Sequence, residues 1–277
     1  MSVKCFDPYL KADALQDSDL ANLAYFGVEQ VILISHAPRT FSRESELISY
    51  WEELIDREVT RFARHGIDAH VSLGVHPAAF PTRTAPGLLR NLGSLANHER
   101  VVALGELTVT EDVSRQWSLL EKQAALAAEA KLPLLVRVTG DLKINTTYKI
   151  ASKLTRQNFP ADRACFCIDD LSLAESMLAD GFRVMLSVGP LDLDARETGA
   201  GVRTLIAALG EEGVAERLML TSGARDGASD VLALARAVQS LERAGFSSDQ
   251  IDGWAFENAA RCFLGASVVF KEKGGTR

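Results

Sequence analysis

Glu106 is a single carboxylate that directly follows a short apolar run at residues 101–105. An apolar run of this length that ends at glycine is typical of a buried strand. A carboxylate at the end of such a strand can act as a general base or as the partner of a cation. Which of these roles it has depends on the side chains that follow the neighbouring strands.

Ionisable and polar side chains also stand at the predicted carboxyl ends of the other strands. They are Asp7, Tyr9 and Lys11 after the first strand, Ser35, His36 and Arg39 after the second, His76 after the third, Arg137 after the fifth, Asp169 and Asp170 after the sixth, Ser187 after the seventh, and Thr221 and Ser222 after the eighth. Strands this apolar rarely end in so many ionisable groups, which indicates a shared functional pocket.

The two cations in this set allow several kinds of chemistry. Lys11 can form a salt bridge to Glu106 or Asp170, bind an anion, or act as a base or Schiff-base nucleophile if its pKa is depressed. Arg137 can pair with a carboxylate of the protein or recognise a substrate carboxylate or phosphate. We therefore treat Lys11, Glu106, Arg137 and Asp170 as the candidate catalytic residues.

Four further residues are candidates for lining the pocket and binding a ligand. His76 precedes a proline in a loop at the mouth, where it can face a ligand or make a structural hydrogen bond. Tyr9 and His36 are expected only to line the pocket. Ser222 lies in no motif that supplies a neighbouring base, so it is expected to line the pocket and not to act as a nucleophile.

The elements that position these residues alternate regularly along the chain. Strands are expected at residues 3–7, 28–34, 68–75, 101–105, 132–138, 164–168, 182–188 and 217–221. Helical patterns follow them, and the first helix is expected to be capped by Asp17 or Ser18. Eight such repeats predict an α/β fold, a single (β/α)8 TIM barrel with an extra C-terminal helix that begins at the Ser247 capping box. We expect the barrel to span residues 1–265, followed by a partly disordered tail at 266–277.

Composition narrows the class of protein. The 277 residues are 47% hydrophobic and carry a formal net charge of -7, which argues against general nucleic-acid binding. The sequence has no run of about 18 apolar residues, so no membrane span is expected, and the N-terminus does not look like a signal peptide. Cys165 and Cys167 share one face of a strand and are expected to be buried, reduced thiols. These features predict a cytoplasmic location, and they do not define an oligomeric state.

Several short motifs, taken together and in order, resemble the TatD-like hydrolases. They are DPYLKA after the first strand, GVHP after the third, LGEL at the fourth, LPLLVRV at the fifth, the apolar strand before IDD, and ENAARCFLG near the end. The resemblance runs over nearly the whole chain. That family consists of metal-dependent, amidohydrolase-like barrels and includes deoxyribonucleases. The resemblance implies a barrel whose mouth holds one or two divalent cations that activate a water molecule.

The sequence departs from this family at most of the positions that bind metal. The resemblance places the two histidines after strand one at Tyr9 and Lys11, the histidine of strand five at Arg137, the histidine after strand six at Asp170, and the aspartate after strand eight at Gly223; only Glu106 is retained. A divalent ion about 5 Å from one of the new cations would meet roughly 7 kcal/mol of repulsion at an effective dielectric constant of about 20. We therefore expect no metal cofactor.

Three functions remain open. The first is a barrel that has lost its metal site, is non-hydrolytic, and binds a small anionic ligand or a protein partner at its mouth. The second is a metal-independent enzyme that uses Lys11, Glu106, Arg137 and Asp170. The third is a metal-dependent hydrolase with rearranged ligands, drawn from His36, His76, Glu106 and Asp170. Nuclease activity is not expected.

Overall fold

A computed structural model of the protein describes residues 3–35, 40–79, 87–111, 113–140, 142–189, 193–224 and 230–265. Within these ranges the chain forms one sheet of parallel strands in the order β1 to β8. The strands are β1 (Cys5–Leu10), β2 (Val28–Ile34), β3 (Asp68–Leu73), β4 (Val101–Leu107), β5 (Leu134–Arg137), β6 (Ala164–Ile168), β7 (Arg183–Ser187) and β8 (Leu218–Thr221). The predicted (β/α)8 TIM barrel is confirmed.

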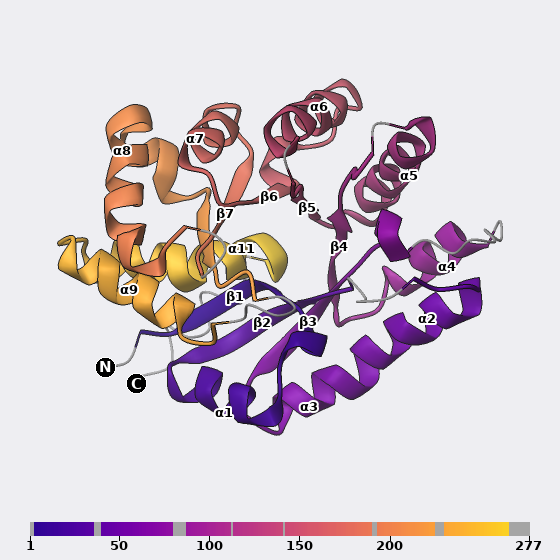
Figure 1. The fold of residues 1–277 in the computed structure, drawn as a ribbon, viewed down its shortest axis with the longest axis horizontal. Coiled ribbons are helices and arrows are strands. Elements are labelled where there is room, and N and C mark those ends of the chain that lie inside the picture. Colours follow the sequence, from indigo (N-terminus) through magenta and orange to yellow (C-terminus); the bar gives the residue numbers. More distant parts are fainter. Residues whose placement is uncertain are drawn as a thin grey trace.

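Helices follow the strands in chain order and surround them (Figure 1). They are α1 (Asp17–Tyr25), α2 (Glu44–Glu53), α3 (Val59–Ala63), α4 (Leu88–Leu95), α5 (Ser114–Ala130), α6 (Lys143–Arg156), α7 (Leu171–Ala179), α8 (Thr198–Ala215), α9 (Ala233–Arg243), α10 (Ser248–Asp252) and α11 (Asn258–Phe263). None of the helices in the described ranges is both long enough and apolar enough to cross a membrane.

The extra C-terminal helical segment closes one end of the barrel. The ring centroid of Phe6, early in β1, lies 6.2 Å from that of Phe256 and 6.5 Å from that of Phe263. The side-chain amide of Asn258 donates to the carbonyl oxygen of Leu218, the first residue of β8, at 2.8 Å. Because these contacts involve the starts of strands, α11 covers the amino-terminal end. The carboxyl ends, where barrels of this class place their sites, form the opposite end.

The predicted boundaries of the first strand and of the first helix were wrong, and the fourth strand continues past residue 105 to Leu107. The first strand continues past Pro8 to Leu10, because Pro8 lies at an irregularity where the register between β1 and β2 shifts. Proline is tolerated there since it need not donate to the ladder. The first helix begins after Gln16, which forms a capping box with Asp19, so neither Asp17 nor Ser18 is the N-cap. The capping box at Ser247 is confirmed.

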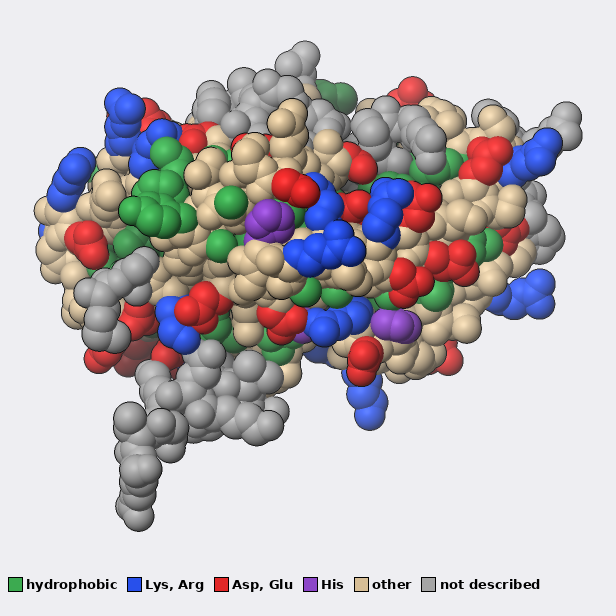
Figure 2. All heavy atoms as spheres, turned by 90° about the horizontal axis from the view of Figure 1, so that it is seen from below, with side chains coloured by type: hydrophobic (Ala, Val, Ile, Leu, Met, Phe, Trp, Pro, Cys, Tyr) green, Lys and Arg blue, Asp and Glu red, His purple; other side chains and the backbone are tan. Residues whose placement is uncertain are grey.

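The predicted tail at residues 266–277 lies outside the described residues. Surface charge is mixed on the face that carries α1 and α3. Figure 2 shows this face with Lys and Arg side chains interspersed among Asp and Glu. This arrangement fits the modest net charge of the chain and offers no single-sign surface on that side.

Candidate functional site at the barrel mouth

Glu106, in β4, is held at the mouth by Gly105 before it and by Gly74, which directly follows β3. Gly105 has φ 146°, and a Cβ atom there would lie 2.8 Å from the Cβ of Leu135 and even closer to the Leu135 carbonyl oxygen. A Cβ on Gly74 would lie 2.8 Å from the carbonyl carbon of Gly105. The hydroxyl of Ser72 donates to the Gly105 carbonyl oxygen at 3.1 Å. Only glycine therefore fits immediately before Glu106, which explains the LGEL pattern.

His76 is the imidazole beside Glu106. Its Nε2 lies 3.6 Å from Oε1 of Glu106, and its Nδ1 accepts a hydrogen bond from the backbone N–H of Ala78 at 3.1 Å. Burial, and to a smaller extent the charge of Lys11, lowers the pKa of His76 to about 4. The ring is therefore neutral at pH 7, and since Nδ1 is an acceptor, the proton is on Nε2 and faces Glu106.

The loop that carries His76 is anchored by a helix. The side-chain oxygen of Gln123, on α5, accepts from the N–H of Val75 at 2.7 Å, and its Nε2 donates to the Val75 carbonyl oxygen at 3.3 Å. Gln123 is buried, so both polar groups of Val75 are satisfied away from water. This pairing fixes the backbone just before His76 and so fixes the direction of the imidazole.

Lys11 follows β1 and lies in the same cluster. Its backbone N–H donates to the carbonyl oxygen of Ala224 at 3.1 Å, which attaches the end of β1 to the loop after β8. Lys11 is 7% exposed, and its charge is one of the causes of the low pKa of His76. Lys11 therefore acts electrostatically on His76, which in turn lies beside Glu106, and the three residues come from three different strands or strand ends.

Arg137 forms a second cluster at the ends of β5 to β7. Its guanidinium donates to the Sγ atom of Cys167 at 2.8 Å and to the Ser187 hydroxyl at 3.3 Å. It also lies 5.1 Å from the centroid of the Tyr9 ring, in cation–π geometry. Arg137 is 3% exposed, and Tyr9 beneath it is 1% exposed. The predicted candidates Tyr9 and Arg137 are therefore in contact with each other.

Asp7 connects the first and last strands. Its carboxylate accepts from the Thr221 hydroxyl at 2.6 Å, from the Ser222 hydroxyl, and from the Ser222 N–H at 3.3 Å. Burial raises the pKa of Asp7 to about 6, and the hydrogen bonds from Ser222 and Thr221 oppose that rise. The hydroxyl of Ser222, a predicted pocket residue, is thus directed at Asp7, where it helps to close the barrel.

Asp170 has a local structural partner. Its Oδ1 accepts from the backbone N–H of Leu173 at 2.8 Å, so the side chain is the N-cap of α7. Its neighbour Asp169 accepts from the Lys143 ammonium at 2.6 Å. The β6 side chain that contacts Arg137 is Cys167, which the sequence analysis predicted only to be a buried thiol. Register could have identified it, because Cys167 pairs with Arg137 across β5 and β6.

The fourth predicted pocket residue, His36, lies outside the described residues. Within the described ranges, no three or more His, Cys, Asp or Glu side chains are grouped closely enough to hold a metal ion. What the mouth does show is two buried cations, Lys11 and Arg137, in separate clusters that share the wall formed by β1. One cluster contains the His76–Glu106 pair, and the other contains a thiol, a hydroxyl and an aromatic ring.

Comparison with known proteins identifies a family. A family model described as TatD related DNase matches residues 8–200. An uncharacterized metal-dependent hydrolase from Methanocaldococcus jannaschii is 29% identical over 130 residues, which make up 47% of this chain and 51% of the relative. The chain therefore matches about half the length of this curated relative.

Solved structures share the fold over nearly the whole chain. A TatD-like protein from Archaeoglobus fulgidus matches with a TM-score of 0.76 and 24% identity, covering 94% of this chain and 99% of that one. A TatD homologue from Escherichia coli matches with a TM-score of 0.64 and 20% identity, covering 95% and 99%. A phosphotriesterase homology protein from Escherichia coli, solved with phosphate in its active site, has a TM-score of 0.67 and 15% identity, with 95% and 99% coverage.

Proposed function

This chain belongs to the TatD-related DNase family, and we propose that it is a member whose barrel mouth binds a small anion in place of divalent metal. The observation that carries the proposal is the burial of two cations, Lys11 and Arg137, at 7% and 3% exposure. The family resemblance places metal-binding imidazoles at both positions. Two cationic side chains at one barrel mouth create a positive local field, which favours an anionic ligand.

The donor chemistry of these positions does not suit a divalent cation. Zinc and similar metals need lone pairs from imidazole, thiolate or carboxylate groups. Ammonium and guanidinium groups offer only N–H donors, and Gly223 offers no side chain. Glu106, the retained ligand position, has the imidazole of His76 at 3.6 Å. We therefore assign no metal-dependent step to this mouth, and we expect no hydrolysis of DNA.

Each residue has a defined part in the proposed site. Arg137, oriented by Cys167, Ser187 and the Tyr9 ring, presents planar N–H donors that match a carboxylate or phosphate. Lys11 supplies a second positive charge, and Glu106 balances it when no ligand is bound. His76 offers its Nε2–H as a neutral donor. Because these side chains are all nearly buried, the ligand must be small.

Thermal unfolding with inorganic phosphate and small dicarboxylates tests the proposal. A ligand that binds only the folded state raises the free energy of unfolding by about 2.7 kcal/mol at a hundred times its Kd. We expect Tm to rise with ligand concentration in the wild-type protein and in Lys4→Met, whose lysine forms an exposed ion pair with Glu29. Arg137→Lys and Arg137→Met should lose the response. No response in the wild type, or an equal response in the Arg137 variants, would contradict the proposal.

A second candidate is a metal-independent enzyme, and the His76–Glu106 contact favours it. Because Nδ1 of His76 accepts from the Ala78 N–H, Glu106 is the member of this pair that can accept a proton, and the neutral Nε2–H of His76 can orient its carboxylate. Because Oδ1 of Asp170 accepts from the backbone N–H of Leu173 as the N-cap of α7, a metal-independent enzyme would depend on Glu106 and His76 more than on Asp170. Turnover that persists with a chelator and stops in Glu106→Gln would favour it. A metal-dependent hydrolase with ligands from His36, His76, Glu106 and Asp170 is the third candidate, and stoichiometric bound metal would favour that one.

A further inference from the structure

Helix α6 is strongly basic. Its sequence, KINTTYKIASKLTR, contains Lys143, Lys149, Lys153 and Arg156 and no acidic residue. The whole chain has a net charge of -7, and the face that Figure 2 shows mixes both signs. Two of these cations form ion pairs, Lys143 with Asp169 and Lys153 with Glu121. The helix still carries an excess of positive charge in an acidic protein, and the resulting local field selects negatively charged partners.

Two hollows run along this helix and form one furrow. The first, of about 420 Å³, lies between α5 and α6 and is lined by Trp117, Tyr148, Lys149, Ser152, Lys153 and Arg156. The second, of about 560 Å³, shares Trp117 and Lys149 with the first and extends to Thr110, Glu111 and Thr139, beyond the ends of β4 and β5. Figure 1 shows α5 and α6 as neighbours on the outside of the barrel. We call this continuous hollow the α6 furrow.

Apolar side chains are exposed around the furrow. Val113, Leu142, Ile144 and Tyr148 are 43%, 68%, 45% and 41% exposed, and they are most of the large exposed hydrophobic residues in the described part of the chain. Leu142 and Tyr148 line the furrow itself. Scattered exposed apolar residues need no explanation, but a cluster beside a concave surface is typical of a protein interface.

The furrow has a rigid centre. The ammonium of Lys153 lies 5.3 Å from the centroid of the Trp117 ring and also pairs with the Glu121 carboxylate. The Tyr148 hydroxyl donates to the Ser176 hydroxyl at 2.8 Å. These contacts hold both aromatic side chains in place, so less conformational entropy is lost when a partner binds them.

We propose that the α6 furrow binds an acidic, partly apolar peptide segment of another protein. Carboxylates of the segment would pair with Lys149 and Arg156, and its apolar side chains would contact Trp117, Leu142 and Tyr148. The aliphatic edge favours a peptide over single-stranded nucleic acid, because bases stack on aromatic rings and gain little from leucine or isoleucine. The concave shape favours a peptide over a membrane surface. This inference does not depend on the function proposed for the barrel mouth.

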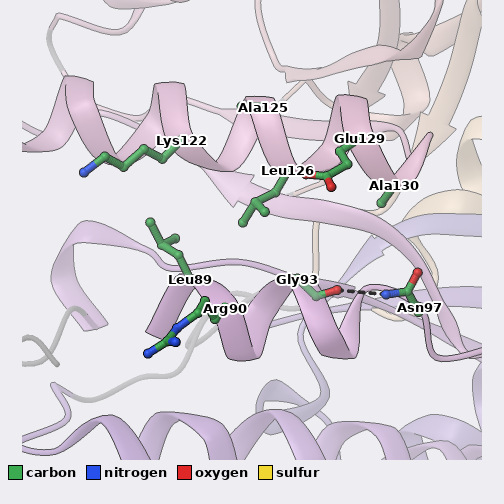
Figure 3. A pocket seen from close by; sticks show the side chains of 9 residues that line it. All are labelled: Leu89, Arg90, Gly93, Asn97, Lys122, Ala125, Leu126, Glu129 and Ala130. Atoms are coloured by element: carbon green, nitrogen blue, oxygen red, sulfur yellow. Dashed lines mark hydrogen bonds between the residues drawn. The ribbon is translucent and has the colours of Figure 1, made fainter. Parts of the chain in front are cut away.

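A neighbouring groove provides a matched control. It has about 670 Å³ between α4 and α5, on the other side of α5 from the furrow. Figure 3 shows Arg90 and Lys122 at one end of it and Glu129 at the other, with Leu126 pointing toward Gly93. Its lining has two cations and one carboxylate, whereas the lining of the furrow has three cations and one carboxylate, Glu111, so an acidic segment should bind the groove less well. Reversing Arg90 and Lys122 changes the net charge by the same amount as reversing Lys149 and Arg156.

The test measures binding of a defined probe to the full-length protein by fluorescence anisotropy. The probe is a short, labelled synthetic peptide in which glutamates alternate with leucine and phenylalanine. We expect Lys149→Glu combined with Arg156→Glu to weaken its binding about tenfold or more, and Leu142→Ser to weaken it about threefold. Arg90→Glu combined with Lys122→Glu should leave it within about twofold. Thermal unfolding of each variant confirms that it is folded.

Three outcomes would overturn the inference. One is the absence of saturable binding of the peptide to the wild-type protein. Another is equal weakening by the two charge-reversed pairs, which would show that only net charge matters. The third is tighter binding of labelled oligothymidine, or of vesicles rich in phosphatidylserine, at the same residues, which would assign the furrow to nucleic acid or to lipid. A glutamate–serine peptide that binds as well as the probe would remove the apolar part of the inference.

Discussion

The Nε2 atom of His76 lies 3.6 Å from Oε1 of Glu106, while Nδ1 of the same ring accepts from the Ala78 N–H. Both side chains are nearly buried, and the positive charge of Lys11 acts on the imidazole. The ring is therefore kept neutral in one tautomer, with its remaining proton directed at a carboxylate. The pKa of a neutral imidazole beside a buried cation depends on the charge of that cation.

Removing the charge of Lys11 should raise the pKa of His76. Burial and Lys11 lower that pKa from 6.5 to about 4, so Lys11→Met should move it part of the way back. The measurement is an NMR titration of the imidazole nitrogens. Lys4→Met, which removes an exposed lysine paired with Glu29, should leave the titration unchanged. A wild-type pKa near 6.5 would show that His76 is not buried beside a cation.

Asp7 and His76 should have opposite effects on stability as pH changes. The folded-state pKa of Asp7 is raised from 3.8 to about 6, so its contribution is present at low pH and is lost as pH rises through 6. The folded-state pKa of His76 is lowered to about 4, so its contribution is present above 6.5 and is lost as pH falls toward 4. Each shift corresponds to about 3 kcal/mol. Between pH 4 and 6 the two should nearly cancel.

Asp7→Asn removes one side of this balance. When pH is lowered from 6.5 to 4, the free energy of unfolding of Asp7→Asn should fall by about 3 kcal/mol, whereas that of the wild type should stay nearly constant. The reason is that the variant keeps only the His76 contribution, which is lost over this range. His76→Gln should show the reverse slope and become more stable as pH falls from 6 to 4. Urea unfolding at several pH values measures both. Parallel pH profiles for the two variants would refute the assigned shifts.

Gly105→Ala should destabilise the barrel severely. A methyl group there would lie 2.8 Å from the Cβ of Leu135 and closer still to its carbonyl oxygen. Crowding of this kind, added to the cost of φ 146° for alanine, is expected to total about 3 kcal/mol or more. Gly66→Ala is the control, because Gly66 also has positive φ, 79°, but no heavy atom lies within 4 Å of the position that a Cβ would take there. That variant should lose only about 1 kcal/mol; equal losses would refute the packing argument.

Mild oxidation should join Cys165 to Cys262. Their Sγ atoms lie 3.5 Å apart, and the contact with Cys165 lowers the pKa of the Cys262 thiol. The Cys262 thiolate, the more accessible of the two, can attack oxidised glutathione and release one glutathione thiolate. Cys165 then loses its proton, attacks Sγ of Cys262 and expels the second glutathione. Peptide mass mapping should find this pair linked. Cys167, which contacts Arg137 inside the barrel, should stay reduced, and a linkage through Cys167 would contradict the structure.

The alternation of strands and helices was visible in the sequence because each repeat carries its own periodicity and terminator. From that alternation the convergence of Lys11, His76 and Glu106 also followed, since all strand ends of a barrel meet at one mouth. The extra C-terminal helix was marked by its capping box at Ser247. These features are local in sequence or follow from topology, and they needed no knowledge of side-chain direction.

Features that depend on side-chain direction could not be obtained in this way. Asp170 was placed at the mouth by position alone, although an aspartate three residues before Leu173 is also an N-cap signal, and the structure shows that cap. Cys167 was overlooked because its importance comes from the register between β5 and β6. Asp7 reaches Thr221, 214 residues away, and no local pattern predicts a hydrogen bond across the barrel closure.

The metal content of the purified protein tests the central claim most directly. The protein should be prepared without chelators, incubated with zinc or manganese, dialysed, and measured by plasma mass spectrometry alongside Glu106→Gln. Because Lys11 and Arg137 occupy positions that the family resemblance gives to metal-binding imidazoles, we predict far less than one metal ion per chain in both proteins. One or more ions per chain in the wild type, lost in Glu106→Gln, would contradict this claim.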